Sequence, residues 1–212
     1  MRTWLASRLY EPSMCLGEVA GMRARRRALL QRAHGRTVEI GSGTGLNLPH
    51  YPGTIDELIL TEPDPGMRER LHRHVLRDRP GTRILGDEAG ALSLAADSVD
   101  TVVSTLVLCS VEDPAAVLDE LVRVLRPDGQ LLFIEHVRSQ SPRLARWQDR
   151  LEQPWRRFAS GCRCNRDTLG LIGDAGFSAD VRHETWRWSP PLVRPLIVGR
   201  ATADQATGRG IR

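Results

Sequence analysis

The feature that most constrains this chain is a short apolar strand that runs directly into a glycine loop, VEIGSGTG at residues 38–45. Three glycines, Gly41, Gly43 and Gly45, stand at alternate positions of this loop. Glycine suits such a turn because it adopts dihedral angles that other residues avoid and lets a ligand approach the backbone closely. A dinucleotide fingerprint would place a further glycine at position 46, where this chain has Leu46. On its own the loop is compatible with a ligand site or with a tight structural turn.

The order of the predicted elements places this loop at the start of an α/β fold. Apolar segments alternate with amphipathic ones, which predicts a parallel sheet with helices on both faces. The last two strands are joined by a loop that contains Pro190 and Pro191, so they are expected to pair antiparallel at the sheet edge. Strands are predicted at 37–40, 57–61, 82–85, 99–105, 130–135, 177–183 and 196–199, a turn at 127–129, and helices at 65–77, 113–125, 144–158 and 167–175. We therefore expect a mostly parallel seven-stranded sheet with an antiparallel C-terminal edge strand.

The length of 212 residues suits one sizeable hydrophobic core and is short of two domains. Residues 1–36 are predicted to form an N-terminal helical segment that covers the active site, and residues 37–202 form the ligand-binding domain. The small, polar segment 203–212 is expected to be a disordered tail. No apolar run approaches the ~20 residues needed to cross a bilayer, and the first residues lack the apolar stretch of a secretory signal. A cytoplasmic location is therefore expected.

All 30 basic residues are arginine, and the formal net charge is +4. The absence of lysine excludes a P-loop lysine, a Schiff-base lysine and a lysine general base together. Arginines gather at Arg23, Arg25, Arg26 and Arg27, where they could contact phosphate or acidic lipid, but a solvated helix face is favoured. No nucleic-acid partner is expected, a weak peripheral contact with a membrane stays open, and the sequence does not determine the oligomeric state.

Acidic residues stand in or after the first three predicted strands. Glu62 follows the second strand, where an α/β nucleoside site places an acid that accepts hydrogen bonds from ribose hydroxyls, and this role is favoured over a solvated loop acid. Glu39 lies inside an apolar strand, where a carboxylate needs a partner: loop amides through water, or the ammonium group of a cofactor. Asp87 and Glu88 follow the third strand, where a carboxylate can accept the exocyclic amine of adenine.

The cysteines and one histidine are the remaining candidates for chemistry. Cys162 and Cys164 are too close for an ordinary disulfide, and their spacing to Cys15 and Cys109 does not suggest a zinc site, so no metal is expected. Cys109 follows the fourth strand and is read as a small core residue rather than a nucleophile. His136 follows the fifth strand at the edge where ligands bind, so it is a candidate catalytic residue as much as a packed one.

Together these motifs resemble the class I methyltransferases that use S-adenosylmethionine. The resemblance spans about 38–134 and rests on VEIGSGTG, the TEP that ends at Pro63, GDEAGAL, ADSVDTVVSTLVLCSVEDP and LRPDGQLLFIEH. The EHV at 135–137, the SGC at 160–162 and the closing WSPPLVRP narrow it to the thiol-methylating, methyltransferase-like branch and its bacterial relatives. The resemblance implies the Rossmann-like class I methyltransferase fold, with residues 37–202 as the S-adenosylmethionine-binding domain.

The resemblance also implies roles for single residues. It places the three loop glycines against the methionine part of S-adenosylmethionine, Glu62 on its ribose, and Glu88 with Ala89 on its adenine. Thr105 and Leu106 are expected to flank the cofactor and face the substrate. The full set of expected cofactor-binding residues is Glu39, Gly41, Gly43, Gly45, Glu62, Glu88, Ala89, Thr105 and Leu106. The sequence departs from many relatives at Gly90, where they have an acid, and at Cys109, where they have histidine.

The expected function is methyl transfer to a small, apolar acceptor, with a thiol favoured and a lipid or quinone-like acceptor open. The leaving group of such a transfer is a neutral thioether, so the enzyme must chiefly align the reacting atoms. A nicotinamide-dependent reductase is an alternative, which Leu46 argues against. A non-catalytic cofactor-binding protein that contacts RNA or membrane through its arginine-rich helix is another alternative.

Overall fold

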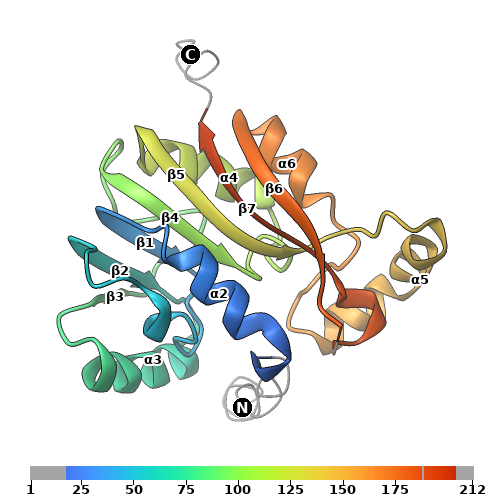
Figure 1. Cartoon of the computed structure of the whole chain (residues 1–212), viewed down its shortest axis with the longest axis horizontal. Helices are drawn as coiled ribbons and strands as arrows, with labels where there is room; N and C mark the ends of the chain where they lie inside the picture. Colours follow the sequence, from blue (N-terminus) through green and yellow to red (C-terminus); the bar gives the residue numbers. More distant parts are fainter. Residues whose placement is uncertain (1–17, 188, 204–212) are drawn as a thin grey trace.

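A computed structural model describes residues 18–187 and 189–203, which form a seven-stranded sheet. The strand order is β3-β2-β1-β4-β5-β7-β6, and the five strands from β3 to β5 are parallel. β7 runs antiparallel between β5 and β6 (Figure 1). The strands are β1 (Arg36–Ile40), β2 (Glu57–Thr61), β3 (Arg83–Leu85), β4 (Val99–Thr105), β5 (Leu125–His136), β6 (Phe177–Thr185) and β7 (Pro195–Ala203).

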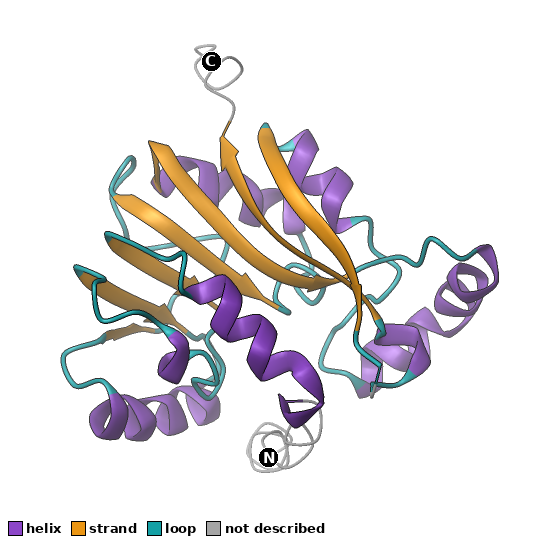
Figure 2. Ribbon diagram, viewed as in Figure 1, coloured by secondary structure: helices purple, strands orange, loops and turns teal. Residues whose placement is uncertain are grey.

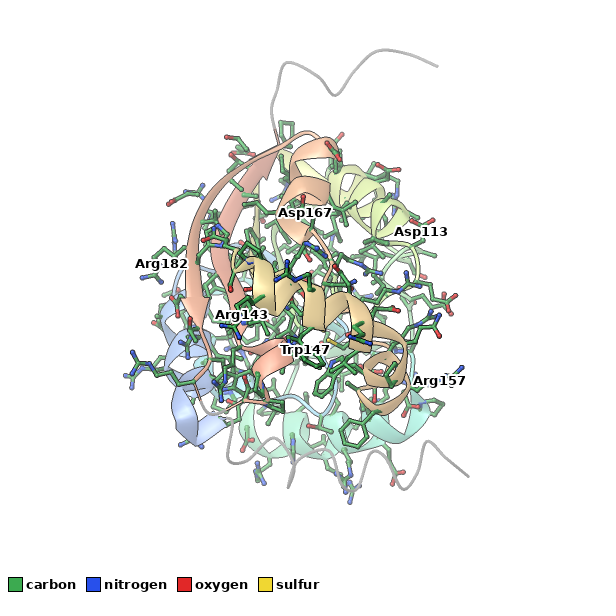
Figure 3. The ribbon with its side chains drawn as sticks, turned by 90° about the vertical axis from the view of Figure 1, so that its right-hand side faces the viewer. Asp113, Arg143, Trp147, Arg157, Asp167 and Arg182 are labelled. Atoms are coloured by element: carbon green, nitrogen blue, oxygen red, sulfur yellow. The ribbon has the colours of Figure 1, made fainter. Side chains whose placement is uncertain are left out.

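Helices pack on both faces of this sheet (Figure 2). The main helices are α2 (Arg23–Leu30), α3 (Pro65–Asp78), α4 (Pro114–Val124), α5 (Pro142–Phe158) and α6 (Thr168–Asp174). The short ones are the π-helix η1 (Glu18–Met22) and the 3-10 helices η2 (Leu48–His50) and η3 (Pro191–Val193). α2, η2 and α3 cover one face, and α4 and α6 cover the other. α5 crosses beside the C-terminal strands, with Arg143 and Arg157 towards its two ends (Figure 3).

The two faces follow from the alternation of side chains along each strand. In β2, Leu58 and Leu60 pack towards α2 and α3, whereas Ile59 between them packs into the core beneath α4. A run of apolar residues whose side chains alternate between two faces is expected of a strand that is buried on both sides. Each such buried side chain contributes roughly 1.5–3 kcal/mol relative to exposure. The continuous apolar segments of the sequence thus place both helical layers.

Aspartate caps fix where three helices begin. The side chains of Asp64, Asp113 and Asp167 accept hydrogen bonds from the backbone N–H three residues later, at the starts of α3, α4 and α6. Pro65 and Pro114 occupy the first helical positions, where a missing N–H costs nothing. These caps set where each helix leaves the loop that follows a strand.

The predicted fold is confirmed, with two refinements. The antiparallel strand β7 lies second from the edge, because its hairpin partner β6 takes the edge position. The predicted turn at 127–129 lies within β5, where the pairing shifts from Val99↔Leu125 to Thr101↔Gln130 and the intervening residues form a bulge. The predictions for residues 1–17 and 204–212 lie outside the described residues. Within the described ranges, no helix has the length and apolar content that a membrane crossing requires.

Candidate active site

The loops after the parallel strands meet at one edge of the sheet. Backbone hydrogen bonds continue the ladder beyond the strands and bind these loops together. Ser42 N donates to Thr61 O at 2.8 Å, Glu62 N donates to Leu85 O at 3.1 Å, and Leu106 N donates to Ile134 O at 2.8 Å. The segments that carry the predicted site residues are therefore neighbours, as expected for the carboxyl ends of parallel strands.

The glycine loop is built from left-handed backbone. Gly41, Gly43 and Gly45 have φ angles of +55°, +58° and +94°, which other residues rarely adopt. A Cβ at Gly41 would lie 2.8 Å from a methyl group of Val107, so side-chain packing also requires glycine there. A Cβ at Gly43 would meet nothing nearer than the sulfur of Met67 at 4.0 Å. Gly43 therefore leaves space that protein atoms do not fill, as a ligand-facing glycine should.

Glu62 fastens this loop to the second strand. Its Oε2 accepts the N–H of Gly43 at 2.8 Å, and its Oε1 accepts the N–H of Asp64 at 2.9 Å. The side chain is buried, and burial is the main cause that raises its pKa above the usual value, while the two backbone donors oppose the rise. A carboxylate has about four lone-pair sites, so two further donors can still bind it.

A buried polar network lies directly behind the loop. Glu39 is fully enclosed, and its carboxylate accepts hydrogen bonds from Tyr51 Oη at 2.6 Å and from Asn47 Nδ2 at 3.0 Å. Burial raises the pKa of Glu39 from 4.5 to about 7, although both hydrogen bonds and the charge of Arg26 oppose this. The partners of this buried acid are thus an amide and a phenol, Asn47 and Tyr51, rather than loop amides, and no sequence motif pointed to either of them.

Arg26 links the N-terminal helix to the same network. Its guanidinium donates to Glu18 Oε1 at 3.0 Å, to Asn47 Oδ1 at 2.8 Å and to Thr105 Oγ1 at 3.2 Å. The interpretation of the arginine cluster as a solvated face is right for the exposed Arg23 and Arg27 and wrong for Arg26, which is buried. The apolar spacing of Leu29 and Leu30 on the same helix was the signal that could have shown which arginine turns inward.

A narrow hollow of about 20 Å³ opens between these groups. Its lining residues come from the loop and from its polar neighbours: Arg26, Glu39, Gly41, Ser42, Gly43, Thr44, Leu46, Asn47 and Thr105. The hydroxyl of Thr44 is buried there and has no hydrogen-bond partner among the described residues. An unpaired buried hydroxyl costs free energy, so this atom points to a polar ligand in the hollow.

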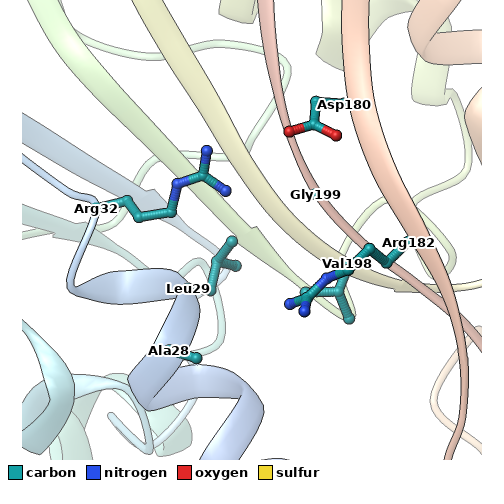
Figure 4. Close-up of a pocket in the computed structure, with 7 residues that line it drawn as sticks. All are labelled: Ala28, Leu29, Arg32, Asp180, Arg182, Val198 and Gly199. Carbon is teal, nitrogen blue, oxygen red and sulfur yellow. The ribbon is translucent and has the colours of Figure 1, made fainter.

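A larger hollow of about 70 Å³ lies elsewhere, between α2 and the last two strands (Figure 4). It is lined by Ala28, Leu29, Arg32, Asp180, Arg182, Val198 and Gly199. None of these residues belongs to the loops at the carboxyl edge, so this hollow is separate from the glycine-loop site.

The turn after β4 is held by Glu135. Its carboxylate accepts the N–H groups of Val107, Leu108 and Cys109 at 3.0–3.1 Å and the hydroxyl of Ser104 at 2.7 Å. The backbone at Leu106, immediately before this turn, has a φ of +61°, which is strained for a residue with a side chain. Four donors to one buried carboxylate fix the turn rigidly and leave that carboxylate with little capacity for a substrate.

Two cysteines and one histidine meet beside this turn. Cys109 Sγ and Cys162 Sγ each lie 3.6 Å from Nδ1 of His136, and the two sulfurs are 4.0 Å apart. All three side chains are buried. We refer to Cys109, His136 and Cys162 as the Cys–His cluster. Spacing along the chain did not reveal it, because Cys109 follows β4, His136 ends β5 and Cys162 follows α5, and only the fold brings them together.

Comparison with known proteins identifies the family. A family profile described as "Methyltransferase domain" matches residues 38–133. Thiol S-methyltransferase TMT1B of Homo sapiens is 35% identical over 199 residues, which cover 85% of this chain and 79% of that protein. The chain belongs to the class I S-adenosylmethionine-dependent methyltransferases. S-adenosylmethionine is therefore its cofactor.

Two further relatives of this methyltransferase differ in what they show. Thiol S-methyltransferase TMT1B of Rattus norvegicus is 38% identical over 169 residues, which cover 76% of this chain and 66% of that protein. A solved S-adenosylmethionine-dependent methyltransferase of Thermotoga maritima, described as a possible histamine N-methyltransferase, has a TM-score of 0.69 at 23% identity and covers 95% of this chain and 100% of its own. That likeness shows the shared fold alone.

The structure gathers part of the predicted cofactor set around the hollow. Glu39, Gly41, Gly43 and Thr105 line it, and Glu62 adjoins it through Gly43. Gly45, Glu88, Ala89 and Leu106 stand on the same edge outside the lining, and Glu88 is exposed. His136, the candidate catalytic residue, lies in the Cys–His cluster rather than in the hollow. The lining is completed by five residues outside the predicted set: Arg26, Ser42, Thr44, Leu46 and Asn47.

Proposed function

We propose that this methyltransferase transfers the methyl group of S-adenosylmethionine to the sulfur of a small, apolar thiol. The observation that supports the thiol is the character of the wall beyond Thr105. Leu106, Trp155, Leu192 and Val193 pack there around buried cysteines, and we call these four residues the acceptor wall. Glu135 beside it is occupied by four donors, so this wall offers little charge to an amine or a catechol. The names of the human and rat relatives support the same acceptor class.

The cofactor is proposed to extend along the carboxyl edge from the hollow. A space of about 20 Å³ holds only a small polar group, which suits the ammonium and carboxylate of the methionine part. Glu39 then faces the ammonium group of S-adenosylmethionine. The open side of Gly43 leaves room for the methionine part of the cofactor to run past the loop. Glu62 lies one strand along and accepts from the ribose through its remaining lone pairs, and Glu88 with Ala89 lies one strand further and meets the adenine.

The chemistry requires alignment more than proton transfer. When bound, the cofactor supplies an electrophilic methyl group on a positively charged sulfur. The rigid turn at Leu106 and Thr105 positions the acceptor in line with that methyl group, and the acceptor wall excludes water. Positioning of this kind can lower a barrier by about 7–11 kcal/mol, which would account for most of the rate.

The N-terminal segment is proposed to close the site. Arg26 contacts both Asn47 and Thr105, which line the hollow, so α2 is tied to the loop after β1 and to the end of β4. The first residues of the chain precede this helix and lie outside the described residues, and we propose that residues 1–36 act as one covering unit.

A cytoplasmic site of action also stays part of this proposal, and cell fractionation tests it.

Two measurements test the proposed function. Calorimetry with S-adenosylmethionine, S-adenosylhomocysteine and NAD should show binding of the first two and none of NAD. A panel of matched alkyl and aryl thiols, phenols, catechols and amines with labelled S-adenosylmethionine should show the fastest turnover with thiols. Turnover confined to amines or catechols would overturn the thiol acceptor and leave the methyltransferase intact.

A further inference from the structure

The Cys–His cluster has the dimensions of a metal site. Three ligand-type atoms, Cys109 Sγ, Cys162 Sγ and His136 Nδ1, all lie within 4.8 Å of one another, with separations of 3.6, 3.6 and 4.0 Å. In a tetrahedral zinc site, Zn–S bonds of about 2.3 Å and Zn–N bonds of about 2.0–2.1 Å place two sulfurs about 3.8 Å apart and a sulfur and a nitrogen about 3.6 Å apart. The observed triangle therefore matches one face of such a tetrahedron.

Packing and hydrogen bonding account poorly for this cluster. The imidazole of His136 is 7% exposed, yet its Nε2 has no hydrogen-bond partner among the described residues. Within the described part of the chain, its Nδ1 has two sulfurs as partners, and thiols are weak hydrogen-bond partners. Burying an imidazole in apolar surroundings without a strong partner costs free energy. A bound cation would give Nδ1 a strong partner in place of two weak ones, and it would leave Nε2 as it is.

The backbone holds the three ligands in place. Cys109 N donates to Glu135 at 3.0 Å, and Cys109 O accepts the N–H of Arg163 at 2.8 Å, so the turn after β4 is tied directly to the segment that carries Cys162. Gly161, with a φ of +92°, lets that segment approach, because a Cβ there would lie 3.0 Å from Ser110 O. Trp186 stacks on the ring of His136 at a centroid distance of 6.1 Å and fixes its plane. The site is thus preorganised.

We propose that Cys109, His136 and Cys162 bind a zinc ion, and that the fourth coordination position of this ion takes the sulfur of the acceptor. Two thiolates balance the charge of a divalent cation, and three protein ligands leave one position open, as in catalytic zinc sites. Cys164 is buried in the same apolar cluster, but its sulfur is not among the three gathered atoms, so the fourth position is not assigned to it. The acceptor part of this inference rests on the proposed function.

A zinc ion would stabilise the thiolate form of the acceptor, which the apolar acceptor wall cannot do. An alkyl thiol is mostly protonated at neutral pH, and apolar surroundings disfavour its thiolate further. Coordination to zinc would favour the thiolate, so the acceptor would bind in that form, its proton having passed to bulk water before the acceptor wall closes around it. A sulfur lone pair then forms the new C–S bond to the methyl group while the C–S bond of the sulfonium breaks, and that electron pair stays on the departing neutral thioether. Leu106 packs against both the cluster and the core beside the glycine loop, which places the ion at the acceptor side.

Metal binding by the purified full chain tests the site directly. Zinc content should approach one ion per chain, and cobalt added to chelator-treated protein should give the near-ultraviolet charge-transfer absorption of thiolate ligands. Cys109→Ser, Cys162→Ser and His136→Ala should each weaken zinc affinity by roughly a hundredfold or more. Cys164→Ser is the matched control, a buried cysteine of the same cluster, and should retain full affinity. Binding of S-adenosylhomocysteine verifies that each variant is folded.

Further measurements distinguish the binding of zinc from the coordination of the acceptor thiol to it. An alkyl thiol should shift the cobalt absorption, whereas the alcohol of the same shape should not. Absence of thiolate-to-cobalt absorption in the wild-type protein would overturn the site, whether or not the variants fold. Equal loss of zinc in Cys164→Ser, or a Cys109–Cys162 disulfide in the protein isolated under reducing conditions, would also overturn it. Full thiol turnover by zinc-free protein would remove the ion from the reaction, and zinc binding without any thiol turnover would instead contradict the proposed function.

Discussion

The glycine loop and the Cys–His cluster lie at the same edge of one sheet but are assembled differently. The loop is held by partners that are close in sequence or on the adjacent strand, such as the bond from Gly43 to Glu62. The cluster joins the last residue of β5 to residues that follow β4 and α5, and it depends on the packing of the C-terminal half. The first region is polar and charged, the second apolar. The glycine loop therefore depends on local contacts, whereas the Cys–His cluster depends on how the C-terminal half packs.

The largest expected effect is that of Glu62→Ala, which should weaken cofactor binding and leave zinc affinity unchanged. Glu62→Ala removes the acceptor of two backbone N–H groups and of the proposed ribose bonds, each worth roughly 1.5–3 kcal/mol when the acceptor is charged. Calorimetry should show that S-adenosylhomocysteine affinity falls by about a hundredfold. Glu69→Ala, an exposed acid of α3, is the control. If zinc affinity fell equally in Glu62→Ala, the two regions would not be independent.

The next effect is a pH dependence that should be confined to the cofactor side. Burial raises the pKa of Glu39 to about 7, so the folded protein binds a proton more tightly than the unfolded chain does. The protonated carboxyl group of Glu39 therefore stabilises the fold at low pH, and this contribution is lost as pH rises from about 4.5 to 7. A cofactor ammonium beside Glu39 would favour the ionised form, so affinity should rise about tenfold from pH 6 to pH 8.

The control for this pH dependence is Glu39→Gln, which keeps the shape and cannot ionise. The cofactor itself titrates equally in both proteins, so the difference between their calorimetric profiles isolates Glu39. Parallel profiles for the two proteins would mean that Glu39 does not face the ammonium group.

The sequence was sufficient for the fold because the fold depends on local patterns. Continuous apolar strands, three aspartate caps and the glycine loop each act within a few residues, so β2 and β4 begin and end as predicted. The Cys–His cluster could not be found in this way. Its spacing along the chain carries no metal pattern, and only the path of α5 and the turn at Gly161 bring Cys162 to Cys109. The inward turn of Arg26 likewise depends on how α2 packs on β5 and β7.

Gly43→Ala distinguishes ligand space from structural need within the loop. The atom nearest to the new methyl group is Met67 Sδ at 4.0 Å, which is ordinary van der Waals contact. The folding cost is therefore that of the left-handed backbone, about 1–2 kcal/mol. Cofactor affinity should fall roughly five- to tenfold because the methyl group occupies the ligand's space. Gly53→Ala, which meets nothing within 4 Å, is the control in thermal unfolding and calorimetry. Unchanged affinity in Gly43→Ala would make the loop a structural turn.

The smallest expected effect concerns the helix that spans the polar side. Arg26→Ala removes three hydrogen bonds, two of them buried, and leaves Glu18 and Asn47 without their charged donor. Leaving buried groups unsatisfied costs roughly 1–3 kcal/mol in stability. Cofactor affinity should fall only about threefold, because Asn47 still bonds Glu39 and Thr105. The exposed Arg27→Ala is the control, and thermal unfolding with calorimetry measures both quantities.

The Arg26 result also decides whether the N-terminal segment covers the whole site or only its polar half. Arg26 contacts Thr105, the last residue of β4, and the turn that carries Cys109 begins directly after it. If the segment closes only the cofactor side, Arg26→Ala should raise the KM for S-adenosylmethionine and leave the KM for the thiol unchanged. A rise in the KM for the thiol alone would place the segment over the acceptor instead. Equal rises in both would show that the rigid turn after β4 couples the two regions, which the separate construction of the glycine loop and the Cys–His cluster argues against.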